Sequence, residues 1–402
     1  MSERPTRRVV VVHNWYRSST PSGENESVAE EVAGLERLGV QVELFGVSSD
    51  EELAATGRAR WGLAGAPFGL PRIRRSYSAT LESFRPDAVL LENLWPFISP
   101  AVIRPSLTSG AAVCAGVRNY RLSCIVGTHQ RGGRPCTQCS PTWKLPGILH
   151  GCLWDSRLIS TPVALSSQWH ARSMLALDRY FANSEFTASY LRGLGVPDGR
   201  IVIRENAVPD PAPSAEPVAL GRRSICFVGR LSSEKGIDLL LDAWEMGAPP
   251  ELSLVIVGDG AERGRADRLA ARDDRVSVMG NIDRSALPSI IAASTCVVVP
   301  SLWNEPFGRV AVEAMAVGRP VVVSDRGGLP SIVDSEVGRV VSPRPEVFNE
   351  VFRWVATESD DVLQRMGRSS RRRYEERFRP EVNLRVLLDG LDQAVLDRER
   401  RA

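Results

Sequence analysis

The fold of this chain is decided by a stretch that joins a short apolar run, a turn and a helical pattern: Val297-Val298-Val299-Pro300-Ser301-Leu302-Trp303-Asn304-Glu305-Pro306-Phe307-Gly308-Arg309-Val310-Ala311-Val312-Glu313-Ala314-Met315-Ala316. The β-branched run that opens it is typical of a buried parallel strand, and the apolar spacing after the glycine is typical of a helix. The turn between them then lies at the carboxyl end of a strand. Open α/β sheets bind their ligands at that edge.

Two glutamates flank this turn, Glu305 in the loop and Glu313 inside the helix. Gly308 lies between them, where the missing side chain lets backbone N–H groups approach a ligand, and a helix N-terminus favours an anion. Each glutamate alone is more often an exposed charge. Placed around one turn, the carboxylates suit hydroxyl groups and the bare amides suit a phosphate, so the stretch predicts a nucleotide-sugar site.

Length and composition narrow the class of protein. The chain has 402 residues, enough for two domains with full cores, and a formal net charge of +2, which argues against nucleic acid as a partner. No apolar run approaches the roughly 18 residues of a membrane span. The run from Val9 to Val12 is too short for a signal-peptide core. We therefore expect a cytoplasmic protein, and its arginine- and alanine-rich usage indicates a bacterial source.

Two series of strand, loop and helix patterns follow each other, which predicts an α/β protein with two doubly wound, Rossmann-like domains. A proline-rich run over 209–217 separates the two series. We expect an N-terminal domain over 1–208, a linker over 209–220, a C-terminal domain over 221–378 and a last amphipathic helix over 379–402.

A nucleoside diphosphate leaving group needs positive charge as its bond to the sugar breaks, from Mg²⁺ or from fixed cations. Arg230 and Lys235 lie together in a loop that follows a predicted strand over 224–229. Arginine can bind two phosphate oxygens at once, and lysine supplies a point charge. For this pair alone, a solvated loop is the simpler interpretation.

Four cysteines lie in an irregular segment over about 120–155, namely Cys124, Cys136, Cys139 and Cys152. The segment is rich in Gly, Pro and Arg, and the C-x2-C spacing of its middle pair favours structural zinc held by four thiolates. Free buried thiols are the equally open alternative. Disulfides are less expected in a cytoplasmic chain.

A basic and aromatic segment over 58–77 includes Trp61 and Phe68. A solvated loop and helix face is the favoured interpretation. The functional alternative is contact with an acceptor or, peripherally, with the inner membrane surface.

The second half resembles the large family-four group of retaining glycosyltransferases, which have the GT-B fold. The resemblance is carried by the segments 228–236 and 257–260, by the Glu-x7-Glu motif from Glu305 to Glu313, and by Gly318-Arg319-Pro320-Val321. It implies two Rossmann-like domains facing across a cleft, with the last helix crossing back to the first domain. It also implies transfer of a sugar from a nucleotide-sugar, with UDP as the expected nucleotide, to a hydroxyl acceptor. It further implies front-face displacement, in which the departing phosphate itself takes the acceptor proton and no protein nucleophile is needed. It implies that no cofactor or metal ion is required, because Arg230 and Lys235 supply the positive charge.

The resemblance also assigns roles to single residues. It gives catalytic roles to Glu305, Arg230 and Lys235, and donor contacts to Gly229, Arg230 and Lys235 at the diphosphate, Asp259 in a second glycine loop, Gly280, Asn281 and Ile282 at the base, Glu313 at the ribose, Glu305, Phe307 and Gly308 at the sugar, and Gly23 from the first domain.

The first half looks like a bacterial subgroup with a Gly-Glu-Asn loop, here at Gly23, and an Asn-Tyr-Arg segment that leads into cysteines, here after Arg118. Relatives usually have histidine where this chain has Arg118. We therefore expect Arg118 to read a modified donor sugar, such as a uronate, a pentose or a deoxysugar.

Two other functions stay open. Another GT-B enzyme, such as an epimerase or a phosphorylase, would share the fold, and so would an inactive sugar-binding protein. The acceptor is expected to be a glycan, a lipid-linked glycan or a natural product.

Overall fold

The computed structural model describes residues 6–18, 23–56, 65–211 and 223–401. Two predicted features therefore lie partly outside the described residues: the basic segment, over 58–64, and the linker, over 212–220. By its contacts the chain divides into two compact units. The first comprises Met1–Arg131, Cys136–Glu205 and Pro380–Ala402, and the second comprises Gly132–Pro135 and Asn206–Arg379.

The first unit is built on a six-stranded parallel sheet with the strand order β2-β1-β3-β4-β7-β8. The strands are β1 (Arg8–Trp15), β2 (Gln41–Ser48), β3 (Ala88–Leu91), β4 (Ala112–Val117), β7 (Arg179–Ala182) and β8 (Ile201–Ile203). A separate two-stranded hairpin pairs β5 (Gln130–Arg131) with β6 (Arg134–Pro135).

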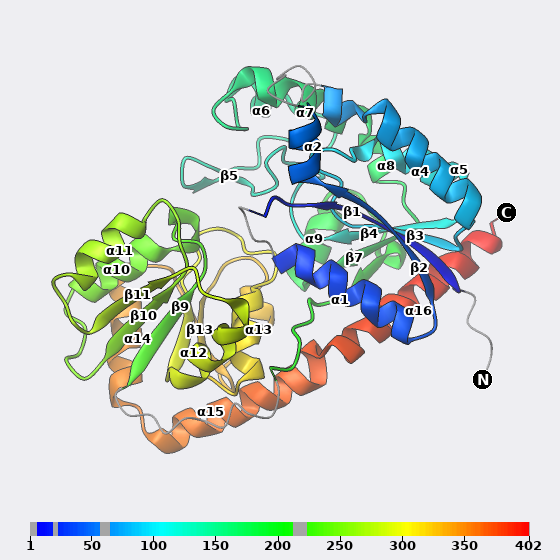
Figure 1. The fold of residues 1–402 in the computed structure, drawn as a ribbon. Helices are drawn as coiled ribbons and strands as arrows, with labels where there is room; N and C mark the ends of the chain where they lie inside the picture. Colours follow the sequence, from blue (N-terminus) through cyan, green and yellow to red (C-terminus); the bar gives the residue numbers. More distant parts are fainter. Residues whose placement is uncertain (1–5, 19–22, 57–64, 212–222, 402) are drawn as a thin grey trace. The chain divides into compact units, whose positions relative to one another are not determined.

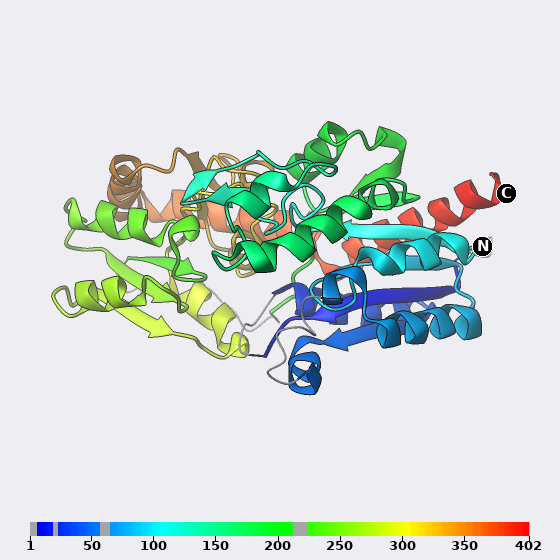
Figure 2. The ribbon, with the colours of Figure 1, turned by 90° about the horizontal axis from the view of Figure 1, so that it is seen from above.

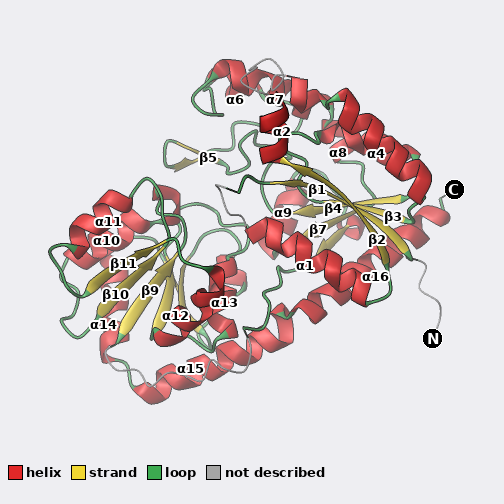
Figure 3. Ribbon diagram, viewed as in Figure 1, coloured by secondary structure: helices red, strands yellow, loops and turns green. Residues whose placement is uncertain are grey.

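Helices cover both faces of this sheet (Figures 1 and 3). They are α1 (Gly23–Arg37), α2 (Ser49–Thr56), α4 (Pro71–Phe84), α5 (Ile103–Thr108), α6 (Leu145–Leu149), α7 (Arg157–Trp169), α8 (Ala171–Met174), α9 (Glu185–Gly193) and α16 (Pro380–Glu399), with short 3₁₀ turns η1 (Ala66–Phe68), η2 (Pro100–Val102) and η3 (Asp198–Arg200).

The second unit repeats the design with the strand order β11-β10-β9-β12-β13-β14, again all parallel. Its strands are β9 (Ser224–Val228), β10 (Ser253–Val257), β11 (Val276–Gly280), β12 (Cys296–Val299), β13 (Val321–Ser324) and β14 (Gly338–Val341). Its helices are α10 (Ile237–Glu245), α11 (Arg263–Ala270), α12 (Leu287–Ala293), α13 (Arg309–Ala316), α14 (Pro345–Thr357) and α15 (Asp360–Arg373). Short turns are η4 (Ser233–Lys235), η5 (Arg284–Ala286), η6 (Leu329–Ser331) and the π turn η7 (Tyr374–Phe378). Figure 2 shows the ribbon from above, with helices on either side of the strands.

Continuous apolar strands explain why each sheet is covered twice. Successive side chains of a strand point to opposite faces. In β12, Val298 joins the core beneath α10 and α14, while Val297 and Val299 join the core beneath α12 and α13. In β1, Val10 and Val9 are divided in the same way between two cores. The prediction of two doubly wound α/β domains is thereby confirmed.

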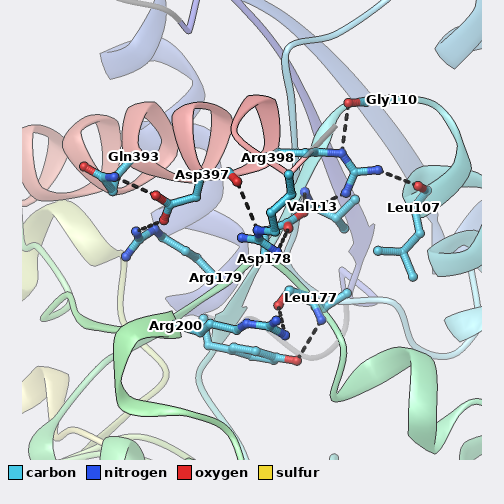
Figure 4. Close-up of polar contacts among 12 residues, drawn as sticks. Leu107, Gly110, Val113, Leu177, Asp178, Arg179, Arg200, Gln393, Asp397 and Arg398 are labelled. Atoms are coloured by element: carbon cyan, nitrogen blue, oxygen red, sulfur yellow. Dashed lines mark hydrogen bonds and ion pairs between the residues drawn. The ribbon is translucent and has the colours of Figure 1, made fainter.

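The C-terminal helix α16 belongs to the first unit and closes one face of its sheet. Its leucines Leu384, Leu387, Leu388 and Leu391 are buried beside β1, β3 and β4. Polar contacts fix its end (Figure 4): Arg398 Nη1 donates to Asp178 Oδ2 over 3.0 Å, and Arg179 Nη2 donates to Asp397 Oδ2 over 2.7 Å. Within the described residues, no helix combines the length and the apolar character needed to cross a membrane.

We predict that Leu387→Ala lowers the free energy of unfolding by about 2–5 kcal/mol, because this fully buried leucine leaves a cavity beneath α16. Urea denaturation of the full chain measures the change. Arg385→Ala, on the exposed side of the same helix, is the matched control and is expected to stay within about 0.5 kcal/mol of the parent. Equal effects of the two substitutions would contradict the burial of this helix face.

Candidate functional site

The strand order of the second unit defines where a ligand belongs. From β9 the chain moves outward through β10 to β11, and it then returns to β12 on the other side of β9. The strand order therefore reverses between β9 and β12. In doubly wound sheets the crevice outside the carboxyl ends of two such strands is the ligand site. The loops over 229–236 and 300–308 lie at those two ends.

These two loops are in direct backbone contact. Gly236 adopts a left-handed conformation, with φ of +75°, at the start of α10, and a Cβ atom placed there would lie 1.9 Å from the carbonyl oxygen of Pro300. Close by, the N–H of Leu302 donates to the carbonyl oxygen of Glu234 over 2.9 Å. Only glycine satisfies both the conformation and the space. The contact holds the two loops in one register.

This register brings Lys235 and Glu305 together across 70 positions of sequence. Lys235 Nζ donates to Glu305 Oε1 over 2.5 Å, and the side chains are 23% and 12% exposed. Ser301 Oγ donates to Glu305 Oε2 over 3.2 Å, and the ammonium lies 5.2 Å from the centre of the Trp303 ring. A half-buried cation thus lies between a carboxylate and an aromatic face, where it is ordered before any ligand arrives.

The backbone of Glu305 is fixed from a third loop. Its carbonyl oxygen accepts a hydrogen bond from the N–H of Gly328 over 2.7 Å. Gly327 packs so closely that a Cβ atom there would lie 2.1 Å from the same oxygen. The loop after β13 therefore supports the loop after β12, and the carboxylate of Glu305 is held at the strand edge.

The helix α13 begins at this edge. Gly308 precedes its first residue with φ of +110°, and Phe307 is buried with its ring centre 5.9 Å from that of Phe378. The buried ring anchors the turn, and the glycine leaves room for Leu329, whose Cδ2 would lie 2.4 Å from an added Cβ atom. Amides at a helix N-terminus attract an anion.

Glu313 has two cationic partners, and only one of them can be expected from the sequence. Its Oε1 atom accepts from Arg284 Nη2 over 2.7 Å and from Arg309 Nε over 3.1 Å. Arg309 lies one helical turn before Glu313, which is a pattern visible in sequence. Arg284 lies 29 positions earlier in another turn, so only the fold brings it there. A ribose hydroxyl would have to share this carboxylate with two guanidinium groups.

Arg230 is an exposed member of the predicted donor contacts. Its side chain is 69% exposed, and its ion pair with Glu234 is long, at 3.9 Å. Exposed pairs of this kind contribute little energy. The guanidinium is therefore weakly held, in contrast to the ordered Lys235.

Backbone hydrogen bonds join the loops after β9, β10 and β11. The N–H of Leu231 donates to the carbonyl oxygen of Asp259 over 2.8 Å, and the N–H of Gly258 donates to the carbonyl oxygen of Gly280 over 2.8 Å. The Asp259 carboxylate accepts from the N–H of Gly260 over 2.7 Å. Gly229 and Gly280 have positive φ, of 153° and 69°. These hydrogen bonds hold the glycine-containing loops together at the carboxyl ends of β9, β10 and β11.

The last two residues assigned to the base follow β11. Asn281 is exposed, and Ile282 is half-buried against the core beneath α12 and α13. Both belong to the second unit, together with the lysine and the two glutamates.

The first unit has its own reversal of strand order, between β1 and β3. Gly23 begins α1 there, and its carbonyl oxygen accepts from Ser27 Oγ over 2.9 Å. The N–H of Asn93 donates to His13 Nδ1, so Nε2 carries the proton and donates to Asn25 Oδ1 over 2.9 Å. Burial lowers the pKa of His13. A neutral histidine thus fixes the first turn of α1 on strand β1.

Arg118 lies in a buried charge cluster of this unit. Its guanidinium pairs with Glu31 and, over 3.0 Å, with Glu92, and Arg204 also pairs with Glu31. Its side chain is 9% exposed. Two carboxylates therefore already engage the guanidinium that the sequence assigned to a donor sugar. That assignment stays a prediction.

The four cysteines of the irregular segment are free thiols. Among the residues that the structure describes, no group of three or more His, Cys, Asp or Glu side chains is arranged to hold a metal ion. The expectation of zinc therefore finds no support. That expectation assumed that few side-chain contacts hold the irregular segment in place, whereas the structure shows two. The Tyr120 and His129 rings stack 4.6 Å apart, and buried Lys144 donates to the carbonyl oxygen of Leu122 over 2.9 Å.

Comparison with known families places a glycosyltransferase domain in each half. The "Glycosyl transferase 4-like domain" model matches residues 22–207, and the "Glycosyl transferases group 1" model matches residues 212–373. The two matches support assignment of the chain to the family-4-like glycosyltransferases.

Curated relatives match over parts of their length. The 2-deoxystreptamine N-acetyl-D-glucosaminyltransferase of Streptomyces fradiae is 28% identical over 266 residues, which are 52% of this chain and 63% of that protein. The D-inositol 3-phosphate glycosyltransferase of Segniliparus rotundus is 35% identical over 157 residues, or 36% of this chain and 34% of that protein. The chain thus spans less than two thirds of these relatives.

Solved structures share the fold over nearly the whole chain. HepE of Anabaena in complex with UDP has a TM-score of 0.66 at 17% identity, over 96% of this chain and 100% of that one. Sucrose-phosphate synthase of Thermosynechococcus elongatus has a TM-score of 0.70 at 20% identity, over 94% and 96%. Together with the two sheets, these similarities show the GT-B type of α/β fold.

We predict that Gly236→Ala destabilises the second unit by at least about 2 kcal/mol, because the methyl group meets the Pro300 carbonyl in a left-handed conformation. Urea denaturation measures the change. Gly264→Ala is the matched control: it lies in the first turn of α11, where the nearest atom to an added Cβ is 3.5 Å away, and we expect no loss. A neutral Gly236→Ala would refute the backbone contact.

A second prediction concerns the buried charge cluster. Burial raises the pKa of Glu92 to about 7, and since the unfolded chain keeps its ordinary lower value, the folded state binds more protons between about pH 4.5 and 7. Stability contributed by this residue therefore falls as pH rises through that window, by up to about 1.4 kcal/mol per pH unit. Glu92→Gln is expected to flatten the decline.

Urea denaturation at several pH values measures this slope. Glu31 acts in the opposite sense and at lower pH: burial raises its pKa, but Arg118 and Arg204 outweigh burial and lower it to about 2, so its contribution is lost only as pH falls below about 4.5. Exposed Glu82→Gln is the control. An unchanged slope in Glu92→Gln would show that Glu92 stays ionised.

Proposed function

We propose that this chain is a retaining glycosyltransferase that moves a sugar from a nucleoside-diphosphate-sugar to a hydroxyl acceptor without a metal ion. The observation that carries the proposal is the pairing of Lys235 with Glu305 at the reversal of strand order between β9 and β12. A fixed cation and helix amides at one strand edge suit the diphosphate of such a donor, and the carboxylate suits its sugar hydroxyls.

The charges explain how this arrangement would promote departure of the nucleotide. Negative charge develops on the diphosphate as its bond to the sugar breaks, and a preorganised ammonium stabilises it without reorganisation. Lys235 is held for this purpose by Glu305 and Trp303. Arg230, which is exposed and weakly paired, is free to close onto the phosphates. Two cations supply the charge that Mg²⁺ supplies elsewhere.

Glu305 and Glu313 would orient the two ends of the donor. In our proposal Glu305 accepts hydrogen bonds from sugar hydroxyls near the reacting carbon, and Glu313 accepts from the ribose. The acceptor hydroxyl attacks from the side of the leaving group. Its proton passes to the departing phosphate oxygen, the oxygen–carbon bond to the acceptor forms, and the configuration of the sugar is kept.

UDP is the nucleotide we propose, with support from the fold shared with a UDP complex of HepE. Gly280, Asn281 and Ile282 would contact the base. Gly23 would contribute from the first unit, and Arg118 would favour a donor with a modified sugar. A glycan, a lipid-linked glycan or a natural product is the proposed acceptor class.

The first experiment is a thermal-shift screen of nucleotides and nucleotide-sugars, followed by detection of released nucleoside diphosphate. A selective ligand raises the melting temperature by mass action. Turnover that is insensitive to EDTA and yields an anomer of the donor's configuration supports the proposal. Epimerised donor, or tight binding without turnover for any acceptor class, would favour the epimerase or the sugar-binding alternative. A preference for UDP-glucose across a donor panel would refute the role of Arg118.

We predict that Lys235→Ala lowers kcat/KM by about 100-fold or more, because the leaving diphosphate loses its ordered counter-charge. Initial rates of nucleotide release measure the effect. Arg268→Ala, which removes an exposed cation from α11 in the same unit, is the matched control and is expected to retain full activity. If both variants turn over like the parent, the diphosphate lies elsewhere.

A further inference from the structure

Helix α7 has its amphipathic pattern inverted. The side turned to the protein carries small residues, Ser160, Ala164 and Ser167, and all three are buried. The opposite side carries Leu158 and Trp169, which are 88% and 82% exposed. Residues spaced by seven and eleven share a helix face, so Leu165 lies in the same row. A helix at the surface of a globular protein normally buries its large apolar side chains and exposes its polar ones.

The exposed apolar surface extends beyond this row. We call it the α6–α7 face, and it is formed by six side chains that are 49–88% exposed: Trp143, Leu149, Trp154, Leu158, Leu165 and Trp169. The helices α6 and α7 pack against each other in the first unit (Figure 1). Arg157 Nε donates to the carbonyl oxygen of Leu149 over 3.0 Å, and the N–H of Lys144 donates to Gln168 Oε1 over 3.3 Å. These contacts hold Leu149 near the start of α7 and Trp143 near its end.

Tryptophan is concentrated on the α6–α7 face. In the described part of the chain, each tryptophan with an exposed side chain, namely Trp143, Trp154 and Trp169, lies on it. Tryptophan prefers the boundary between water and hydrocarbon, where its ring is buried and its N–H stays near polar groups. The composition is therefore that of a membrane interface more than of a protein core.

Basic residues outnumber acidic ones in the stretch that carries the face. Residues 93–177 contain eight Lys and Arg residues, of which Arg118 is paired inward and Lys144 is buried, and a single acidic residue, the exposed Asp155, although the whole chain has 50 basic and 48 acidic residues. Arg157 is exposed at the start of α7, and Arg172 is exposed in α8. Arg74 of α4 lowers the pKa of His170 together with burial, which places it near the C-terminal end of α7. An apolar face with a basic rim complements an anionic lipid surface.

We propose that the α6–α7 face binds this protein peripherally to anionic bilayers, with its tryptophan and leucine side chains in the headgroup region and its arginines on lipid phosphates. The described part of the segment over 58–77 adjoins it, since η1 packs on α7 and Phe68 is 43% exposed. The proposal is independent of the donor site, because α6 and α7 belong to the first unit, whereas Lys235 and Glu305 belong to the second.

The test is flotation of the full chain with vesicles of equimolar phosphatidylcholine and phosphatidylglycerol, compared with phosphatidylcholine alone. We expect binding to the anionic vesicles that weakens with salt. The triple variant Trp154→Ser, Leu158→Ser, Trp169→Ser should lower the partition coefficient at least about tenfold, since three insertable side chains are removed. These side chains are 80–88% exposed, so the melting temperature should stay that of the parent.

The control removes three other exposed apolar side chains, in Leu38→Ser, Met246→Ser, Met279→Ser, which are 51%, 50% and 46% exposed. It should bind vesicles like the parent. Failure of the parent to float with anionic vesicles, or equal binding by the two triple variants, would overturn the proposal. So would a parent dimer in analytical ultracentrifugation that the first triple variant dissociates, because the face would then join two copies of the chain.

Discussion

The second unit depends on the close approach of two backbones, Gly236 against the carbonyl oxygen of Pro300. Any side chain at residue 236 would push the loop after β9 away from the loop after β12. Because the two loops touch, Lys235 and Glu305 can form a short ion pair at the strand edge. The sheet supplies the rigidity, since β9 and β12 are hydrogen-bonded neighbours with cores on both faces. The position of the charges thus follows from packing of the backbone.

The first unit uses the same sheet reversal but fills it differently. Behind the strand edge it buries a cluster of two arginines and two glutamates, including Arg118 and Glu92. Gly116 leaves room for this cluster, because a Cβ atom there would lie 2.4 Å from a Glu92 oxygen. Buried charges of this kind are costly unless they are paired. The first unit therefore directs its charges inward, while the second unit presents Arg230 at its surface.

Helix α7 shows the limit of pattern reading. Its sequence is helical in period, and that pattern by itself would place the row of Leu158, Leu165 and Trp169 in the core. The structure instead turns the Ser and Ala side inward, and Ser166 Oγ donates to the carbonyl oxygen of Pro67 where η1 packs on α7. Leu158 and Trp169 stay exposed, and in our proposal a lipid surface offers them an apolar environment.

The sequence by itself determined the α/β class, the two-domain rhythm and the turn from Val297 to Ala316, because period-two and period-3.6 patterns and glycines with special backbone angles are local properties. It also predicted that the loops at Lys235 and Glu305 belong to one site. Only the tertiary structure decided their pairing, the partnership of Arg284 with Glu313, and the inward pairing of Arg118. These contacts join residues far apart in the chain, and their geometry depends on strand order, packing space and burial, which no local pattern encodes.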